Sequence, residues 1–247
     1  MLLVKIFFPA RVKLLPFLKG GKMPAKFSKS EAIKFGWSVM KANFLFFLGI
    51  LFVIVVVNIV FSGFMGLFKK APFLYMIFNL ASVALGMIIN MGVIKIVLKF
   101  YDKQKPEFAD LYKQYRLILN YFLGSLLCGL AVVAGFILFI IPGIYLGIKL
   151  QFFGYFIVDK KMGPVEALKA SWAITKGSFW NLFLFGLVCI GVNILGVMAL
   201  GIGLLVTIPT TMMAVAFVYR KLSLGGGEVV SKPAPVAPAP AAPVPAV

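Results

Sequence analysis

The sequence predicts an all-α polytopic membrane protein, in which six transmembrane helices form three repeats of an interfacial amphipathic helix followed by a transmembrane hairpin. Three observations predict this class: the composition, a series of apolar runs, and a repeated amphipathic segment. Of the 247 residues, 62% are hydrophobic and only 13% are charged, whereas a soluble domain carries about 25% charged residues. Water is therefore the wrong solvent for most of the chain.

The apolar runs have the length that a membrane span requires. About 20 apolar residues are needed to cross a hydrocarbon core roughly 30 Å thick. Five runs are almost free of charge: residues 44–66, 73–94, 117–141, 179–197 and 198–218. A sixth run, 143–158, is shorter and carries Lys149. We therefore expect six spans, with outer turns at residues 62–72, at Pro142 and Gly143, and around Gly196, Gly201 and Gly203.

Basic residues are distributed unevenly between alternate loops. The basic-rich segments are residues 1–43 with nine lysines and arginines, 95–116 with six, 160–176 with four, and the chain after residue 219 with three. The loops between them carry only Lys69 and Lys70. Positive residues favour the cytoplasmic side of a membrane. A net charge of +18 could by itself suggest nucleic-acid binding, but its distribution instead predicts a multi-pass membrane protein with both termini in the cytoplasm and no nucleic-acid partner.

Two amphipathic segments are near copies of one another. "EAIKFGWSVMKANF" begins at residue 31 and "EALKASWAITKGSF" at residue 166, 135 residues later. Each predicts a helix that leads directly into a span. Tryptophan at the headgroup level and lysines towards the phosphates suit a helix in the membrane interface. The predicted interfacial collar therefore contains Trp37, Lys41, Trp172 and Lys176.

Helix-start signals precede both copies. Ser28 and Glu31 match the S-x-x-E capping box, with an apolar stripe at Ile33, Trp37 and Met40. Pro164 suits the first position of a helix because its missing N–H is not needed there.

A weaker third copy, "DKQKPEFADLYKQYRLILNYF" (102–122), aligns with "DKKMGPVEAL" (159–168) and predicts an apolar stripe. Its members are Leu111, Tyr115, Ile118 and Phe122. The copies divide the chain into a basic arm (1–27), a six-helix membrane domain (28–222) and a tail (223–247). The repeats within the domain are residues 28–101, 104–158 and 163–219. The tail is glycine-rich and then Pro/Ala-rich, a composition that predicts disorder.

The sequence lacks the residue patterns of an active site. It contains no histidine, which is the commonest general base, and no glycine-rich phosphate loop or G-x-S-x-G motif. Glu31, Glu107, Asp110, Asp159 and Glu166 stand at predicted helix starts or in linkers, where a carboxylate stabilises a helix dipole. Both cysteines lie in apolar runs without a CxxC partner. We therefore expect no catalytic residues, no cofactor, no metal ligands and no enzymatic activity.

Lys149 is the residue that most suggests a site. A charge inside a span marks a functional site by default, and Lys149 lies roughly 15 Å from Asp159 by helical rise, near mid-depth. Its partners would be carbonyls, water, lipid phosphate or an amide such as that of Asn193. The simpler interpretation is a snorkelling lysine. Pro209 breaks a hydrogen bond in the last span, which nearby threonines can replace. Transporters use such breaks at binding sites, and packing kinks are the commoner cause.

Two functions remain open at this stage. The first is a membrane protein without catalytic machinery that organises lipids or partner proteins at the cytoplasmic face. The alternative is a transporter or lipid-handling protein with a possible intramembrane binding site formed by Lys149, Pro209 and Asn193. Membrane lipids are the expected partners, with membrane proteins as further candidates, and the oligomeric state is left open.

One part of the chain resembles a known family. The stretch "IIPGIYLGIKLQFFGYFIVDKKMGPVEALKASWAITKGSFWNLFLFGL", followed by "GIGLLVTIPTTMMAVAFVY", resembles a poorly characterised prokaryotic family of six-helix membrane proteins. That family includes the membrane domain fused to some glycerophosphodiester phosphodiesterases. The resemblance covers roughly residues 28–222 and implies a fold and a membrane location. The acidic and histidine-bearing catalytic barrel of those enzymes is absent from this sequence, so the resemblance implies no activity.

Overall fold

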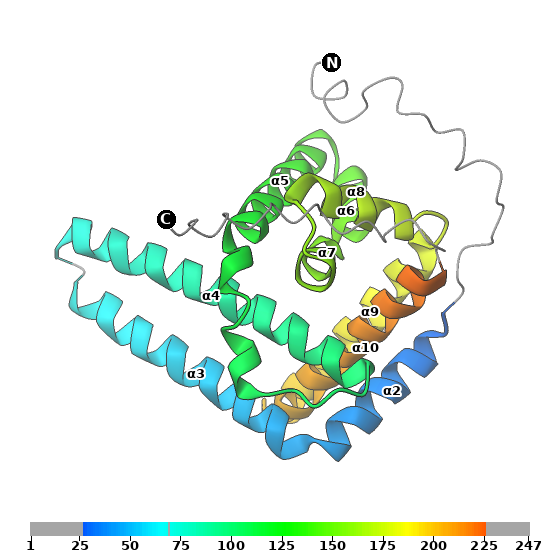
Figure 1. Cartoon of the computed structure of the whole chain (residues 1–247), viewed down its shortest axis with the longest axis horizontal. Helices are drawn as coiled ribbons and strands as arrows, with labels where there is room; N and C mark the ends of the chain where they lie inside the picture. The colour runs from blue at the N-terminus through cyan, green and yellow to red at the C-terminus, as the bar shows by residue number, and fades with distance from the viewer. Residues whose placement is uncertain (1–26, 69, 226–247) are drawn as a thin grey trace, which may run out of the picture.

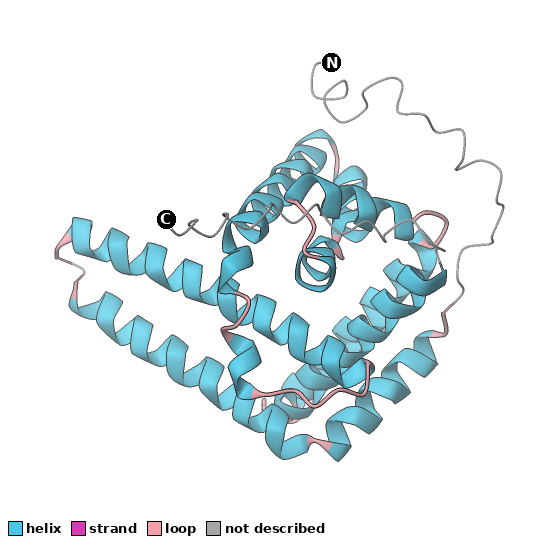
Figure 2. Ribbon diagram, viewed as in Figure 1, coloured by secondary structure: helices cyan, strands magenta, loops and turns pink. Residues whose placement is uncertain are grey.

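The computed structural model describes residues 27–68 and 70–225, over which the chain forms only helices and loops (Figure 2). The predicted basic arm lies outside these residues, apart from Phe27, as does most of the predicted tail. Five helical segments are long and apolar enough to cross a membrane: Phe44–Gly66, Pro72–Tyr101, Phe108–Leu138, Ile140–Lys160 and Phe179–Met198. The structure therefore confirms the all-α membrane class.

The elements follow the predicted order along the chain (Figure 1). They are α2 (Lys29–Ala42), α3 (Phe44–Leu67), α4 (Pro72–Tyr101), the 3₁₀ turns η1 (Phe108–Leu111) and η2 (Tyr115–Leu117), α5 (Ile118–Leu138), α6 (Ile140–Leu150), α7 (Phe153–Lys160), α8 (Pro164–Ile174), α9 (Phe179–Met198) and α10 (Leu204–Gly225). Helix α10 takes the place of the last predicted span, residues 198–218. It is not among the five candidate spans, because Pro209, three threonines, Arg220 and Lys221 lower its hydropathy.

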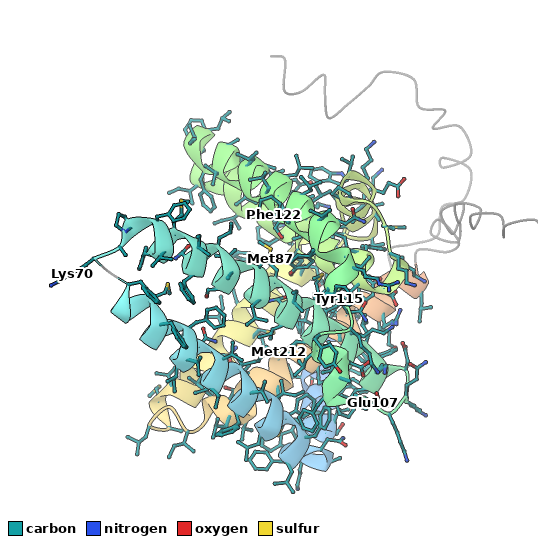
Figure 3. The ribbon with its side chains drawn as sticks, turned by 60° about the vertical axis from the view of Figure 1, so that its left-hand side comes forward. Lys70, Met87, Glu107, Tyr115, Phe122 and Met212 are labelled. Atoms are coloured by element: carbon teal, nitrogen blue, oxygen red, sulfur yellow. The ribbon has the colours of Figure 1, made fainter. Side chains whose placement is uncertain are left out.

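The α3–α4 hairpin extends away from the rest of the molecule (Figure 1). Lys70 at its tip and Glu107 in the segment before η1 lie at opposite sides of the molecule (Figure 3). Many large apolar side chains of α3 are exposed, as Leu45, Phe52 and Ile59 illustrate. An exposed apolar surface of this extent marks contact with a membrane or a partner, which agrees with a hairpin that hydrocarbon surrounds.

The buried core lies at the other ends of the hairpins. It joins the C-terminal parts of α4, α7 and α10 with α2, α8 and the start of α9. Its largest fully buried side chains include Met91 and Leu98 of α4, Phe156 of α7, and Met213 and Tyr219 of α10. The second arm of each hairpin is therefore buried towards its C-terminal end.

Helix α2 packs along α10, from which it is separated by more than 160 residues of sequence (Figure 1). Gly36 allows the two backbones to approach closely, because a Cβ atom at this position would collide with the carbonyl of Thr210. The rings of Phe35 and Phe217 pack with centroids 5.2 Å apart. Ser28 caps α2 by accepting the Glu31 N–H at 3.4 Å, so the predicted helix start is confirmed.

Two other pairs of elements make equivalent contacts. The first is η1 on α4, where Gly92 leaves room for the backbone of Leu111 and Lys99 forms a 2.7 Å ion pair with Asp110. The second is α8 on α6 and α7. In all three cases, a segment that precedes one hairpin packs on the second arm of another.

The middle amphipathic segment differs from its prediction. Residues 104–117 form two 3₁₀ turns in place of a continuous helix. Of the predicted apolar stripe, Leu111 is buried, whereas Tyr115 and Phe122 are exposed. A reciprocal capping box between Glu107 and Asp110 and the Lys99 ion pair hold the tight turn. A 3₁₀ turn lets the backbone of Leu111 reach Gly92, which explains why local helical periodicity was overridden.

The second outer turn was also misplaced. Helix α5 ends at Leu138 and α6 begins at Ile140, so the turn is at Phe139 and not at Pro142 and Gly143. Proline is tolerated in the first helical turn, and Gly143 instead packs against Phe136 and Gly135. The returning arm, predicted as one run, is broken between α6 and α7 at Gln151 and Phe152.

The close approach of α2 to α10 generates a matched pair of glycine variants. Gly36→Ala should lower the free energy of unfolding by about 1–3 kcal/mol, because the new methyl group overpacks the contact with Thr210. Gly63→Ala on α3, where a Cβ would meet open space, should be neutral or stabilising by up to about 1 kcal/mol through helix propensity. Denaturant titration of both variants in detergent measures the difference. Equal stability would contradict the close packing.

Candidate functional site

Lys149 lies at the end of α6 and is only 3% exposed. Its Nζ donates a hydrogen bond to the backbone carbonyl of Thr175, at 2.8 Å. It also lies 5.5 Å from the ring centroid of Tyr145 and 5.6 Å from that of Trp172, within the range of a cation–π interaction. A backbone carbonyl is one of the partners that the sequence analysis proposed.

Thr175 follows the last residue of α8, so the ammonium group of Lys149 sits at a helix C-terminus. The last carbonyls of a helix lack intrahelical donors, and the helix dipole places partial negative charge there. Lys149 therefore provides both a hydrogen bond and charge compensation to α8. This arrangement accounts for a buried lysine without a carboxylate partner.

Two hydroxyl groups at the C-terminal end of α8 form hydrogen bonds with the backbone at the break between α6 and α7. Ser171 donates to the carbonyl of Lys149 at 2.9 Å and accepts the Phe152 N–H at 3.1 Å. Thr175 also donates to the Lys149 carbonyl, at 3.2 Å. In a continuous helix the N–H four residues later would occupy that carbonyl. The second copy of the collar motif therefore supplies the hydroxyls that satisfy the break between α6 and α7, at positions where the first copy has Gly36 and Met40.

The contact between Lys149 and Trp172 has a consequence for depth. The sequence placed Lys149 near the middle of the membrane and Trp172 at the headgroups, and a 5.6 Å contact does not allow both. Lys149 lies at the level of α8, whichever depth that helix has.

Pro209 and Asn193, the other predicted members of an intramembrane site, lie near each other but make contacts different from those of Lys149. Asn193 donates to Thr211 at 3.4 Å and to the Cys189 carbonyl at 3.0 Å. Around Pro209, Thr210 donates to the Val206 carbonyl and Thr211 to that of Thr207. The carbonyl that Pro209 frees is that of Leu205, and none of these threonine hydroxyls donates to it, so the predicted compensation by threonine is not seen. The structure does not join these residues and Lys149 into one site.

The predicted collar residues lie on two separate helices. On α2, Trp37 is 50% exposed and Lys41 is exposed. On α8, Trp172 is half-buried against Lys149, and Lys176 is exposed in the turn that follows this helix. The two tryptophans therefore hold equivalent positions in the sequence but have different surroundings in the structure. Only Trp172 takes part in a cation–π contact.

A groove of about 600 Å³ runs along α2 beside α10. Lys34 and three serine side chains line it together with Glu31, Phe35 and Phe217. Glu31 lies 3.5 Å from Lys221 of α10, which offsets its negative charge. Hydroxyl groups and a lysine at the edge of an apolar wall can donate hydrogen bonds to a phosphate oxygen. The lining residues of serine type are Ser28, Ser30 and Ser38.

Three helix ends meet in a charged cluster. Arg220 of α10 forms ion pairs with Asp102 after α4 and with Asp159 of α7, the latter at 2.8 and 3.0 Å in a bidentate arrangement. Tyr219 donates to the same Asp159 carboxylate at 2.9 Å. The cluster therefore ties together three elements that are about 60 residues apart in sequence.

The sequence analysis missed this cluster, although a signal for it was present. The three second arms end in Tyr101-Asp102-Lys103, Val158-Asp159-Lys160 and Tyr219-Arg220-Lys221. Aligning these ends would have placed one arginine opposite two aspartates. A separate ion pair lies beside η1, where a hydrogen bond from Lys113 lowers the pKa of the Glu107 carboxyl.

Comparison with known proteins gives relatives without an established activity. The model of a family described as "Protein of unknown function (DUF975)" matches residues 125–224. "Uncharacterized protein Mb2590" of Mycobacterium bovis is 29% identical over 158 residues, which are 63% of this chain and 48% of that protein. "Uncharacterized protein Rv2560" of Mycobacterium tuberculosis is 28% identical over the same extent.

The chain spans about half the length of the curated relatives it matches, and no solved structure matches. These findings support similarity to an uncharacterised prokaryotic family. The part of the resemblance that concerns glycerophosphodiester phosphodiesterases stays a prediction.

The contacts of Lys149 generate a stability prediction. Lys149→Met should lower the free energy of unfolding by about 1–3 kcal/mol, because the Thr175 carbonyl loses its charged donor and keeps only the Ser178 N–H. Lys176→Met, at an exposed position one residue beyond Thr175, should stay within about 0.5 kcal/mol of the unchanged protein. Denaturant midpoints of both proteins in the same detergent give the comparison. A neutral Lys149→Met would favour a snorkelling lysine.

The charged cluster generates a second prediction with an adjacent control. Arg220→Met leaves the largely buried Asp159 carboxylate without its bidentate partner and should cost about 3–5 kcal/mol. Lys221→Met removes the exposed pair with Glu31 and a cation–π contact with Phe217, each worth about 0–1 kcal/mol at an exposed site. Thermal unfolding in detergent separates the two cases. Similar melting temperatures for both variants would show that the cluster does not join the three helices.

Proposed function

We propose that the chain crosses a prokaryotic cytoplasmic membrane six times, as three repeats with both termini in the cytoplasm. Three observations support this topology: the five candidate spans, the place of α10 at the last predicted span (198–218), and the distribution of lysines and arginines. The repeats are those of the sequence analysis, 28–101, 104–158 and 163–219.

Matched positions in the three second arms support the repeat assignment. Gly92, Lys149 and Thr210 each lie ten residues before a member of the charged cluster. Each is also the place where an amphipathic segment contacts the arm: Leu111 at Gly92, Ser171 at Lys149 and Gly36 at Thr210. In this arrangement the collar segment of every repeat packs on the second arm of the preceding one, and α2 closes the ring on α10.

We further propose that the protein is not an enzyme and that it holds anionic phospholipid headgroups at its cytoplasmic face. The observation that carries this proposal is the α2 groove, in which Lys34 stands among serine hydroxyls beside the exposed Lys41 and Trp37. A basic amphipathic helix that is anchored to the bundle along one face leaves its lysines free for lipid phosphates. Membrane proteins that share this lipid layer are further candidate partners, and nucleic acid is not expected.

The contacts of Lys149 favour this function over the transport alternative. Its ammonium group already has a carbonyl and two aromatic rings around it, and its position serves the attachment of α8. The Asn193 amide nitrogen donates to Thr211 across α9 and α10, and the bonds around Pro209 lie within α10. Among the described residues the buried Asn193 oxygen has no hydrogen-bond partner, so packing accounts for Lys149 but not for every polar group of Asn193.

The lipid proposal is tested with charge-matched variants. The protein is incorporated into nanodiscs of mixed phosphatidylcholine and phosphatidylglycerol, and retained lipids are identified by native mass spectrometry. Lys34→Gln with Lys41→Gln should weaken retention of phosphatidylglycerol by roughly 30-fold, since each lysine near an anionic surface is worth about 1 kcal/mol. Lys69→Gln with Lys70→Gln, which removes the same charge from the predicted outer turn, should change nothing. Equal losses in both pairs, or in neither, would contradict headgroup binding at α2.

A further inference from the structure

A cavity of about 240 Å³ lies among α4, α5, α7 and α10, apart from the α2 groove. Ile94 of α4, Gln151 at the helix break and Met212 of α10 line it from three sides. These residues hold matching positions, because each lies eight residues before Asp102, Asp159 or Arg220. Figure 3 shows Met212 in the interior of the molecule's outline. The cavity is therefore lined by matching positions of all three second arms.

A stack of aromatic and charged groups lies between the cavity and the ends of these arms. Tyr155, which lines the cavity, packs against Tyr219 with ring centroids 5.0 Å apart. Tyr219 donates to Asp159 of the charged cluster. Eight residues of helix correspond to about 12 Å, so the charged cluster lies roughly two helical turns beyond the cavity along these arms.

The lining of the cavity is polar without being charged. Its ten residues include no lysine, arginine or carboxylate. Asn90 and Tyr121 share a 3.0 Å hydrogen bond. Gln151 donates its amide to the Ile148 carbonyl, which leaves its side-chain oxygen as an acceptor. Among the described residues, the Tyr155 hydroxyl takes part in no hydrogen bond, and its side chain is half-buried, whereas Asn90 and Gln151 are exposed.

Because Asn90 and Gln151 are exposed, the cavity is open on one side. Where lipid and not water covers that opening, the hydrogen-bonding groups need partners, since leaving them unsatisfied in a low-dielectric setting is costly. The volume is smaller than the roughly 300–1,000 Å³ of sites for drug-sized ligands, which suits a small molecule or one part of a larger one. Apolar walls from Val93, Val97 and Met212 would exclude a charged occupant. The site therefore selects uncharged groups that accept and donate hydrogen bonds.

The level of the cavity suggests where such groups come from. Gln151 follows Lys149 by two residues, and Lys149 contacts Trp172 of the collar helix. The cavity thus lies at the level of the collar, which we place in the membrane interface. At that depth a lipid carries its uncharged glycerol and ester oxygens, between headgroup and tails. We propose that the cavity binds an uncharged glycerol group, supplied either by a diacylglycerol or by a free polyol.

Native mass spectrometry of the full chain in phosphatidylcholine nanodiscs tests this proposal. The probes are dioleoylglycerol in the lipid and glycerol in the buffer. We expect one bound dioleoylglycerol per protein. Binding that only glycerol shows would identify the free polyol as the source. Retention of neither probe by the unchanged protein would overturn the proposal.

Variants then locate the bound probe. Tyr155→Phe removes one hydroxyl, keeps the ring against Tyr219, and should weaken binding about threefold to tenfold. Val93→Phe should abolish binding by filling the cavity. Tyr75→Phe, at an exposed site near the start of α4, is the matched control and should bind like the unchanged protein. Unchanged affinity in Tyr155→Phe, with its melting temperature preserved, would overturn the assignment of this cavity even if Val93→Phe fails to fold.

Discussion

The close approach of each collar segment to a second arm is the contact on which the other features depend. Hydrocarbon surrounds a membrane helix as favourably as another apolar helix does, so packing in a membrane relies on small residues and polar contacts. Gly36, Gly92 and Ser171 supply these at three matching places. With the segments packed there, the C-terminal parts of α4, α7 and α10 converge and Arg220 reaches both aspartates. A cavity lined by all three of these helices remains beside them.

The distribution of burial divides the molecule into two regions with different solvents. The hairpins present long apolar surfaces with few internal contacts, whereas the collar segments and the arm ends share a dense core of aromatic and aliphatic side chains. Lys149 belongs to the second region. Its burial reflects the attachment of α8 to the broken α6–α7 arm, and the same break exposes Gln151 to the central cavity. One local interruption thus serves both the collar and the cavity.

Local patterns predicted the helices well, and long-range contacts account for the failures. Apolar length predicted the spans, and the serine cap of α2 followed from single-residue chemistry. The tight turn at Leu111, the break after Leu150 and the charged cluster did not, because each depends on a residue brought from another repeat. The spacing of ten residues between Gly92 and Asp102, repeated at Lys149 and Thr210, was the available signal, and its meaning emerges only when the arms lie side by side.

The ring closure of α2 on α10 is the central claim, and zero-length carbodiimide crosslinking in native membranes tests it most directly. Glu31 and Lys221 lie 3.5 Å apart and are both partly exposed, although 190 residues separate them in the sequence. The account predicts an intramolecular amide between these two side chains, identified by mass spectrometry of the digested monomer. Crosslinks of Glu31 to lysines of other elements, with none to Lys221, would contradict the cyclic arrangement.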